Sequence, residues 1–190
     1  MASSGERARR RAVFLDRDGT INVDANYLRD PDEFQLIPGA GEAIKALNDA
    51  GWLVIVITDQ SGIGRGWLTE ETLNSIHQRM AAHLAAYGAH VDAIYHCPHT
   101  PYDQCSCRKP SPEMVFRAAH EHNIDLRASW FVGDRARDVE TGRRAGCRPA
   151  LVLTGFGQGE LVSAGHPDVV AEDLHAVVRT ILGGRNWERT

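Results

Sequence analysis

The 190-residue sequence predicts an α/β fold, a mostly parallel sheet with helices on both faces. Short apolar runs alternate along the chain with segments whose apolar residues recur at helical spacing. Several of these runs end in acidic, hydroxyl or basic residues, and sheets of this class bind ligands at the carboxyl ends of their strands. No repeat, linker or low-complexity segment divides the chain, so we expect one domain over residues 12–190.

Two strands, two helices and a flap are expected in the first half of the chain. Residues 12–15 are wholly apolar and predict the first strand, and the polar, aperiodic stretch 20–38 predicts a flap over it. Apolar residues recur at helical spacing in 39–50, and the glycine after them ends this helix. Residues 53–57 are a continuous run of leucine, valine and isoleucine, which is typical of a buried parallel strand. Segment 69–87 begins with a threonine suited to cap the second helix.

The second half of the chain continues the alternation. A short apolar run predicts the third strand, and the helix after the next polar loop has proline in its first turn. Two more apolar runs, each followed by a helical pattern, complete the order. The expected strands are 91–96, 130–133 and 150–153, and the expected helices are 112–122, 137–145 and 172–182.

The composition is that of a soluble globular protein. Hydrophobic residues make up 43% of the chain, and the formal net charge of -4 argues against a nucleic-acid partner. Arginines cluster in residues 1–11, a polar stretch that we expect to be a disordered tail, with a nucleic-acid-binding arm as the alternative. No stretch has the pattern of a signal peptide or a membrane span, so we expect a cytoplasmic protein without a membrane partner. No exposed apolar stripe stands out, which favours a monomer.

The segment most informative about chemistry follows the first predicted strand. Asp16 and Asp18 stand one residue apart there, and Gly19 and Thr20 come next. Two carboxylates so close repel each other unless a cation lies between them or one keeps its proton. The segment therefore predicts a site for a divalent metal ion, a nucleophile with an acid/base partner, or both.

Three further polar segments are expected at the same edge of the sheet. Thr58 follows the second strand, Arg108 and Lys109 follow the third, and Asp134 ends the fourth, with Asp138 one turn later. Together these segments would supply ligands for a divalent cation, hydroxyl groups for an anion and a positive charge, as a phosphoryl-transfer site requires. Lys109 is one of two lysines in a chain with 19 arginines, which indicates a need for a compact ammonium group.

Three of the four cysteines cluster with a histidine just before Arg108. The pattern is Cys-x-His-x₅-Cys-x-Cys, and three thiolates with one imidazole make a closed tetrahedral zinc set, which predicts a structural Zn²⁺ that orders the loop. Free core cysteines beside a surface histidine are the alternative, and Cys147 is expected to be a buried apolar residue. The expected zinc ligands are Cys97, His99, Cys105 and Cys107.

In order and spacing, the four polar segments resemble the motifs of the haloacid dehalogenase (HAD) superfamily of phosphatases. The resemblance implies a Rossmann-like three-layer sandwich with a minimal cap. It implies that Asp16 attacks phosphorus to form an aspartyl-phosphate, and that Asp18 protonates the leaving group and then activates water. Mg²⁺ would be held by Asp16, the backbone carbonyl of Asp18, and Asp134. Thr58 and Lys109 would hold the phosphoryl oxygens.

The zinc loop before Arg-Lys-Pro narrows the resemblance to the heptose bisphosphate phosphatases and the histidinol-phosphate phosphatases. The first of these families implies a small phosphorylated sugar as substrate, D-glycero-D-manno-heptose 1,7-bisphosphate, cleaved at its C7 phosphate. Histidinol phosphate, a DNA 3′-phosphate and a non-catalytic role in protein interaction are the alternatives. The residues that the resemblance places around the substrate are Arg17, Asp24, Ala25, Asn26, Tyr27, Asp59, Gln60, Ser61, Arg108 and Arg135, the last of these at the second phosphate.

One residue departs from the family pattern. The second motif usually contains Thr-Asn-Gln, whereas this chain has aspartate at position 59. Ionised aspartate only accepts hydrogen bonds, and at about 5 Å with an effective dielectric near 20 it would repel each neighbouring anion by about 3 kcal/mol. Asp59 would then turn away, keep a proton, meet a basic partner such as Arg65, or weaken the enzyme. The hypothesis from the sequence is the last of these, so that Asp59→Asn would raise kcat/KM.

Overall fold

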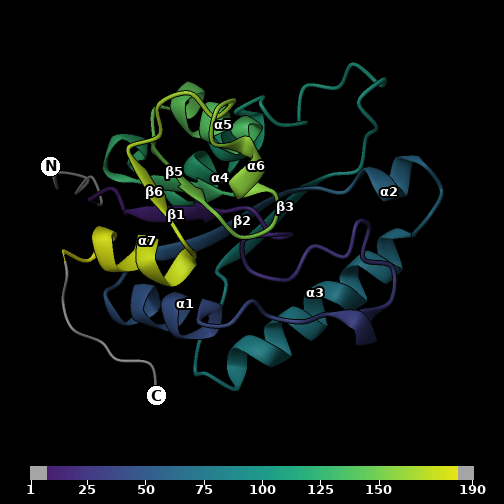
Figure 1. Ribbon diagram of the computed structural model, residues 1–190, viewed down its shortest axis with the longest axis horizontal. Coiled ribbons are helices and arrows are strands. Elements are labelled where there is room, and N and C mark those ends of the chain that lie inside the picture. The colour runs from purple at the N-terminus through teal and green to yellow at the C-terminus, as the bar shows by residue number, and fades with distance from the viewer. Residues whose placement is uncertain (1–7, 184–190) are drawn as a thin grey trace, which may run out of the picture.

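Six parallel strands form one sheet in residues 8–183, the part of the chain that the computed structural model describes (Figure 1). The spatial order is β3-β2-β1-β4-β5-β6, and every neighbouring pair is parallel. The expected α/β fold with a mostly parallel sheet is therefore confirmed. The strands are β1 (Ala12–Leu15), β2 (Leu53–Asp59), β3 (Ala93–Cys97), β4 (Trp130–Gly133), β5 (Arg148–Val152) and β6 (Val169–Ala171).

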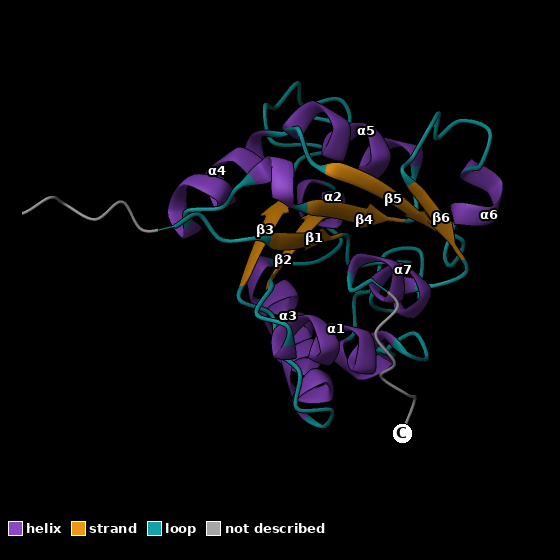
Figure 2. Ribbon diagram, turned by 90° about the vertical axis from the view of Figure 1, so that its left-hand side faces the viewer, coloured by secondary structure: helices purple, strands orange, loops and turns teal. Residues whose placement is uncertain are grey.

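Helices cover both faces of the sheet, with α4 and α5 on one face and α1, α3 and α7 on the other (Figure 2). The alternation of side chains along a strand explains how one apolar run serves both layers. In β1, Val13 and Leu15 pack in the core beneath α1 and α7, whereas Ala12 and Phe14 pack in the core beneath α4. The helices are α1 (Ala40–Asp49), α2 (Ser61–Gly64), α3 (Glu70–Ala85), α4 (Glu113–His122), α5 (Ala136–Ala145), α6 (Gly157–Glu160) and α7 (Leu174–Ile181).

The observed elements differ from the expected ones mainly where polar residues lie in strands or where elements are very short. β2 continues through Thr58 and Asp59, which pair with His96 and Cys97 of β3, so polar residues extend the strand beyond its apolar run. β6 was not expected, because its three residues are partly exposed and give no buried apolar run. The single-turn helices α2 and α6 are too short to produce a periodic pattern.

The folded part of the chain begins before residue 12. The backbone N–H of Arg10 donates to the carbonyl of Asn123 (2.9 Å), and the guanidinium of Arg11 lies 4.5 Å from the centre of the Trp52 ring. These two residues therefore pack against the domain, although the sequence pattern placed them in the tail. Residues 1–7 of that expected tail lie outside the described part of the chain, as do residues 184–190.

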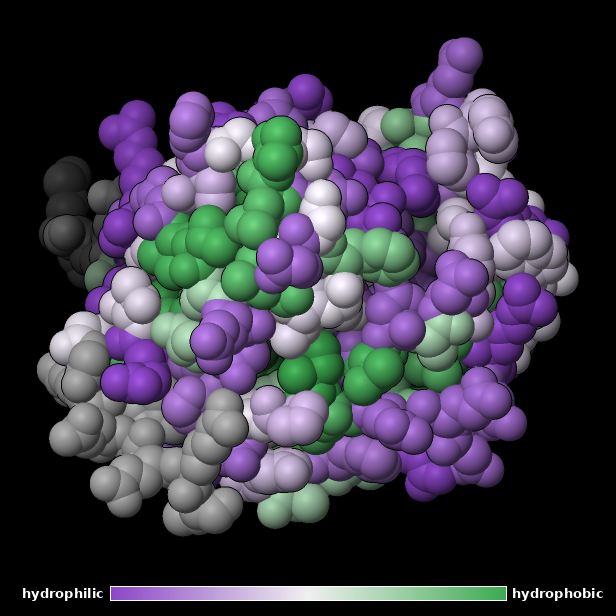
Figure 3. All heavy atoms as spheres, viewed as in Figure 1, coloured by the Kyte–Doolittle hydropathy of each residue, from purple (hydrophilic) through white to green (hydrophobic). Residues whose placement is uncertain are grey.

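Most of the surface in Figure 3 is polar, but apolar side chains gather where α6 and β6 lie in Figure 1. The exposed apolar residues of that segment are Leu161, Val162 and Val170, and Val162 is 97% exposed. Two of them follow a single-turn helix and the third lies in a three-residue strand, so they form no periodic stripe in the sequence. Among residues 8–183, no helix combines the length and the apolar character needed to cross a membrane.

Candidate active site

The sheet order places the candidate site at a topological switch point, where the order of the strands reverses. The chain runs from β1 through β2 to β3 on one side of β1, then crosses back to place β4 on the other side, so the strand order reverses direction at β1. The crevice at the carboxyl ends of such strands is the usual ligand site of open α/β sheets. Asp16 and Asp18 follow β1 and Asp134 follows β4, so the acidic residues of both segments reach this crevice.

A buried lysine joins two of the acidic residues. The Lys109 ammonium lies 2.8 Å from Asp16 Oδ1 and 2.7 Å from Asp138 Oδ1, and it donates a hydrogen bond to the carbonyl of Ile57 (3.2 Å). Its side chain is fully buried. Burial alone would lower the pKa of Lys109, but the carboxylates of Asp138 and Asp16 outweigh it and raise that pKa. Lys109 is therefore a permanent positive charge beside Asp16.

Asp134 completes a compact group of carboxylates. Oxygen atoms of Asp16, Asp134 and Asp138 all lie within 4.8 Å of one another. Asp134 Oδ2 accepts the N–H of Phe156 (2.8 Å), whereas its Oδ1 is buried without a hydrogen-bond partner in the described part of the chain. Burial, followed by the charges of Asp16 and Asp138, raises the pKa of Asp134 to about 7. A cation at this position would relieve that strain between like charges.

Close packing behind Asp134 explains the glycine of the first motif. Gly19 has a φ of 81°, which favours glycine, and a Cβ there would collide with the Asp134 carboxylate. Gly155, also with a positive φ, packs against Gly19, and a Cβ there would meet the same carboxylate oxygen. The motif glycine therefore lets the loop after β1 pass directly over the end of β4.

Asp18 is held by three side chains. Arg17 donates to both of its oxygens (2.9 and 2.8 Å), Asn22 donates to Oδ1 (3.0 Å) and Gln60 donates to Oδ2 (3.0 Å). Burial raises the pKa of Asp18, but the guanidinium of Arg17 and these hydrogen bonds outweigh it and lower that pKa. Arg17 is itself fully buried, and its other side faces His77 (3.4 Å). Arg17 thus supports Asp18 from behind and does not line the pocket in front.

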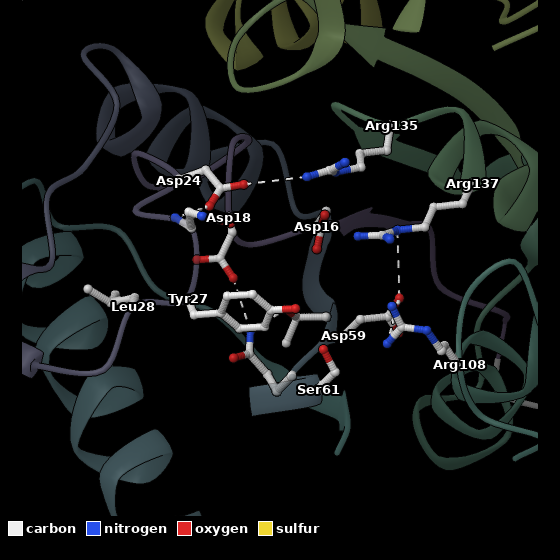
Figure 4. Close-up of a pocket in the computed structure, with 13 residues that line it drawn as sticks. Asp16, Asp18, Asp24, Tyr27, Leu28, Asp59, Ser61, Arg108, Arg135 and Arg137 are labelled. Carbon is white, nitrogen blue, oxygen red and sulfur yellow. Dashed lines mark hydrogen bonds and ion pairs between the residues drawn. The ribbon is translucent and has the colours of Figure 1, made fainter. Parts of the chain in front are cut away.

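A cavity of about 240 Å³ opens beside Asp16 (Figure 4). Figure 4 shows Arg135, Arg137 and Arg108 along one side of it, with their guanidinium groups directed toward the centre. Ala25, Lys109 and Asp134, which the sequence motifs placed in the site, do not line this cavity. The lining residues are Asp16, Asp18, Asp24, Asn26, Tyr27, Leu28, Thr58, Asp59, Gln60, Ser61, Arg108, Arg135 and Arg137.

The flap of residues 20–38 supplies one wall of the cavity. Asn26 and Tyr27 both have positive φ (50° and 76°), which is uncommon for residues other than glycine. This bend directs the Tyr27 ring edge-on against Trp67, with centroids 4.7 Å apart. Across the cavity, Asp24 pairs with Arg135 at 3.8 Å. The flap therefore contacts both the segment after α2 and the start of α5.

Asp59 meets two basic partners, but neither of them is Arg65. Its Oδ2 lies 3.8 Å from the guanidinium of Arg108 and 3.7 Å from that of Arg137, and its Oδ1 accepts the backbone N–H of Lys109 (3.3 Å). Arg65 instead lies over the rings of Tyr27 and Trp67. The suggested Arg65 pair is therefore wrong, because the basic partners of Asp59 are Arg108, from the loop after the cysteine cluster, and Arg137, from the first turn of α5. These two cations offset the negative charge of Asp59, which weakens the expectation that Asp59 repels the substrate phosphate and lowers kcat/KM.

The cysteine cluster forms the loop between β3 and the Arg-Lys-Pro segment. Cys97 Sγ lies 3.6 Å from Cys105 Sγ and 2.9 Å from Cys107 Sγ, and His99 Nδ1 lies 3.3 Å from Cys107 Sγ. One atom of each of the four residues falls within a span of 4.8 Å. The guanidinium of Arg108 donates to the carbonyl of His99 (3.2 Å), so the cluster is tied directly to a residue of the cavity wall.

Comparison with known proteins identifies the family of this chain. Residues 106–177 match a family model described as "HAD-hyrolase-like". The D-glycero-beta-D-manno-heptose-1,7-bisphosphate 7-phosphatase of Bordetella bronchiseptica is 44% identical over 173 residues, 90% of this chain and 97% of that protein. The chain belongs to this family of HAD-like phosphatases. The Pseudomonas putida phosphatase of the same name is 42% identical over 173 residues, 90% of this chain and 98% of its own.

A solved structure of the phosphatase family has the same fold. The D,D-heptose 1,7-bisphosphate phosphatase from B. bronchiseptica, complexed with magnesium and phosphate, superposes with a TM-score of 0.87 at 43% identity. The match covers 91% of this chain and 98% of that protein. Membership in the family and the HAD-like fold expected from the sequence are therefore confirmed.

Sequence reasoning missed several residues that this phosphatase uses to build its site. Arg137 lines the cavity, although the fourth motif drew attention only to the acidic residues around it. Arg137 follows Asp134 closely and lies in the first turn of α5, so its side chain starts near the carboxylate group. That position is the signal that could have indicated it. Leu28 and Asn22 belong to the aperiodic flap, where the sequence gives no sign of which side chains turn inward.

Proposed function

We propose that this phosphatase hydrolyses the C7 phosphate of D-glycero-D-manno-heptose 1,7-bisphosphate. The observation that carries the proposal is the pairing of Asp16 with Lys109 at 2.8 Å, in a carboxylate group shared with Asp134 and beside a cavity with three arginines. A nucleophile next to a permanent cation serves one phosphate, and the arginines serve a second anionic group. The names of the relatives support the choice of sugar.

In the proposed reaction, a carboxylate oxygen of Asp16 attacks phosphorus. A bond forms between this oxygen and phosphorus while the bond to the sugar oxygen breaks. Asp18, whose pKa is lowered in the free enzyme, first takes up a proton from solvent and then donates it to that sugar oxygen. Asp18 then takes a proton from water, and the resulting hydroxide displaces Asp16 from phosphorus and releases inorganic phosphate. The Lys109 ammonium and the Thr58 hydroxyl stabilise the negative charge that builds on the phosphoryl oxygens. Arg17 and Gln60 hold the Asp18 carboxylate in place.

The carboxylate group fits a divalent cation. Asp16 and Asp134 offer oxygen ligands within a few ångströms of each other, and the unpartnered Oδ1 of Asp134 is the atom that would gain most from a cation. Asp138 already pairs with Lys109. We therefore assign Mg²⁺ to Asp16, Asp134 and the backbone carbonyl of Asp18. When bound, it supplies positive charge to the transferring phosphoryl group.

The cysteine cluster fits a structural zinc ion. Zinc–sulfur bonds of about 2.3 Å in a tetrahedron separate the sulfur atoms by roughly 3.8 Å. The Cys105 sulfur lies 3.6 and 3.7 Å from those of Cys97 and Cys107, close to this spacing, whereas the sulfur atoms of Cys97 and Cys107 lie 2.9 Å apart and would have to separate around the ion. All four positions are taken by protein ligands, which leaves no open position for catalysis. Zinc there would fix the loop that carries the carbonyl of His99, and through it Arg108.

Phosphate release from four substrates tests the proposed function. The enzyme with Mg²⁺ is assayed on both anomers of the heptose bisphosphate, on histidinol phosphate and on a DNA 3′-phosphate. We expect the highest kcat/KM on a heptose anomer, and a preference for either other compound would overturn the proposal in favour of that activity. Asp16→Asn should abolish turnover while the protein still folds, whereas the same change at exposed Asp32 should leave activity intact. Turnover by Asp16→Asn would refute the nucleophile.

Two further expectations from the sequence belong to this proposal. A cavity of about 240 Å³ is consistent with a small phosphorylated sugar as the partner. That the enzyme is monomeric and cytoplasmic stays a prediction from the sequence. Sedimentation at several protein concentrations measures the oligomeric state, and a monomer at every concentration is the expected result despite the apolar residues near α6.

A further inference from the structure

Asp59 lies at the end of β2, beneath two guanidinium groups of the cavity wall. Its side chain is 3% exposed, whereas those of Arg108 and Arg137 are 17% and 34% exposed. The two arginines come from separate segments, the loop after the cysteine cluster and the start of α5. Asp59 is the shared carboxylate between them, as the right-hand side of Figure 4 shows.

Asp59 attracts both guanidinium groups but does not use up their hydrogen-bond donors. The ion pairs of Asp59 with Arg108 and Arg137 are 3.8 and 3.7 Å long, beyond hydrogen-bond range. Arg137 Nε and Asp59 Oδ2 are both buried and have no hydrogen-bond partner within residues 8–183. The guanidinium groups therefore keep donors for a ligand while a carboxylate behind them offsets their mutual repulsion.

We propose that Asp59 is a positioning residue that holds Arg108 and Arg137 together as a two-guanidinium anion site, here called the arginine wall. The ligand class is the second phosphate of a sugar bisphosphate, the one that is not hydrolysed, so the inference rests on the proposed function and deepens it. Planar guanidinium groups bind phosphate oxygens in pairs, and two that face one cavity suit a dianion. In this arrangement Arg137 is a binding residue, and Asp59 acts only through the two arginines.

This role reverses the expectation drawn from the sequence alone. There, the negative charge of Asp59 was treated as a burden on a phosphate site, so asparagine was expected to improve kcat/KM. Asparagine is similar in size and keeps an oxygen for the N–H of Lys109. It removes the charge that holds the arginines. The same charge also acts on Lys109, but a change at Lys109 should affect every substrate alike, so a comparison of two substrates isolates the proposed role.

The test compares a bisphosphate with a substrate that has one phosphate. kcat and KM are measured for the heptose bisphosphate and for p-nitrophenyl phosphate with the wild type, Asp59→Asn, Arg137→Gln and the double variant. We expect the ratio of kcat/KM between the two substrates to fall about tenfold in each single variant, mainly through KM of the bisphosphate. Because Asp59 acts partly through Arg137, the loss in the double variant should be smaller than the sum of the two single losses, the remainder being the part that acts through Arg108.

An exposed ion pair outside the cavity provides the control. Asp168→Asn removes the partner of Arg148 there, and its substrate ratio should equal that of the wild type. An equal loss on both substrates in Asp59→Asn, fully additive losses in the double variant, or a rise in kcat/KM on the bisphosphate would each overturn the positioning role. A different result would refute the proposed function itself. In that case the wild-type enzyme would cleave p-nitrophenyl phosphate but not the heptose bisphosphate.

Discussion

Replacement of Lys109 by methionine should destabilise the protein strongly as well as inactivate it. The ammonium serves two carboxylates at 2.8 and 2.7 Å, and the side chains of Lys109 and Asp138 are fully buried. Methionine fills most of the same space but leaves Asp16 and Asp138 facing each other without a cation. Removal of one partner from a buried pair costs about 3–5 kcal/mol, and one cation shared by two anions places this site toward the upper end. For a chain of this length, the expected fall in Tm is roughly 8–20 °C.

The other lysine of the chain provides the matched control. Lys45 pairs with Asp49 on the surface of α1, where the two side chains are 46% and 64% exposed, and Lys45→Met should cost less than about 0.5 kcal/mol. Thermal unfolding is followed by circular dichroism in the absence of divalent ions, and kcat is measured with Mg²⁺. If the Tm of Lys109→Met lies within about 2 °C of that of Lys45→Met, the buried ion pair is not what the geometry indicates.

Three further predictions concern the cation group and the zinc loop. The pKa of Asp134 is raised from 3.8 to about 7, so the metal-free folded state binds more protons than the unfolded state between those values. Asp134 should then lower the free energy of unfolding by about 3 kcal/mol between pH 4 and 7, measured in urea titrations as a fall in the wild type relative to Asp134→Asn or to protein with saturating Mg²⁺. Cys105→Ser should reduce the zinc content measured by elemental analysis from one ion to none and raise KM for the bisphosphate; full zinc content would contradict the assigned ligand set. Gly19→Ala should weaken Mg²⁺ binding measured by calorimetry, whereas Gly51→Ala, also at positive φ but in open space, should change only stability.

The order of strands and helices was largely predictable because buried parallel strands need continuous apolar runs. β1 and β4 have four buried residues each, and the apolar pattern located both correctly. β6 escaped prediction because an exposed edge strand of three residues has no such requirement. Strand ends were less certain, since Thr58 extends β2 through backbone pairing that does not depend on its side chain.

The candidate site was predictable as a set of residues but not as a set of contacts. Motif order brought Asp16, Lys109 and Asp134 to one edge of the sheet, because the carboxyl ends of parallel strands meet there. The direction of a side chain within a motif depends on backbone turns that the sequence does not display. Arg17 thus stands between Asp16 and Asp18 in sequence yet points into the protein, and the basic neighbours of Asp59 come from a loop and a helix far along the chain.

The sheet order has a consequence for how the enzyme matures during its synthesis. β1, β2 and β3 emerge from the ribosome before β4, which must then dock on the open edge of β1. Until that docking, the nascent chain has its nucleophile but lacks the acid of β4, and it exposes an apolar strand edge of the kind that associates with other chains. The candidate site is therefore brought together only after most of the polypeptide has been made, and the step that completes it also covers the exposed edge of β1.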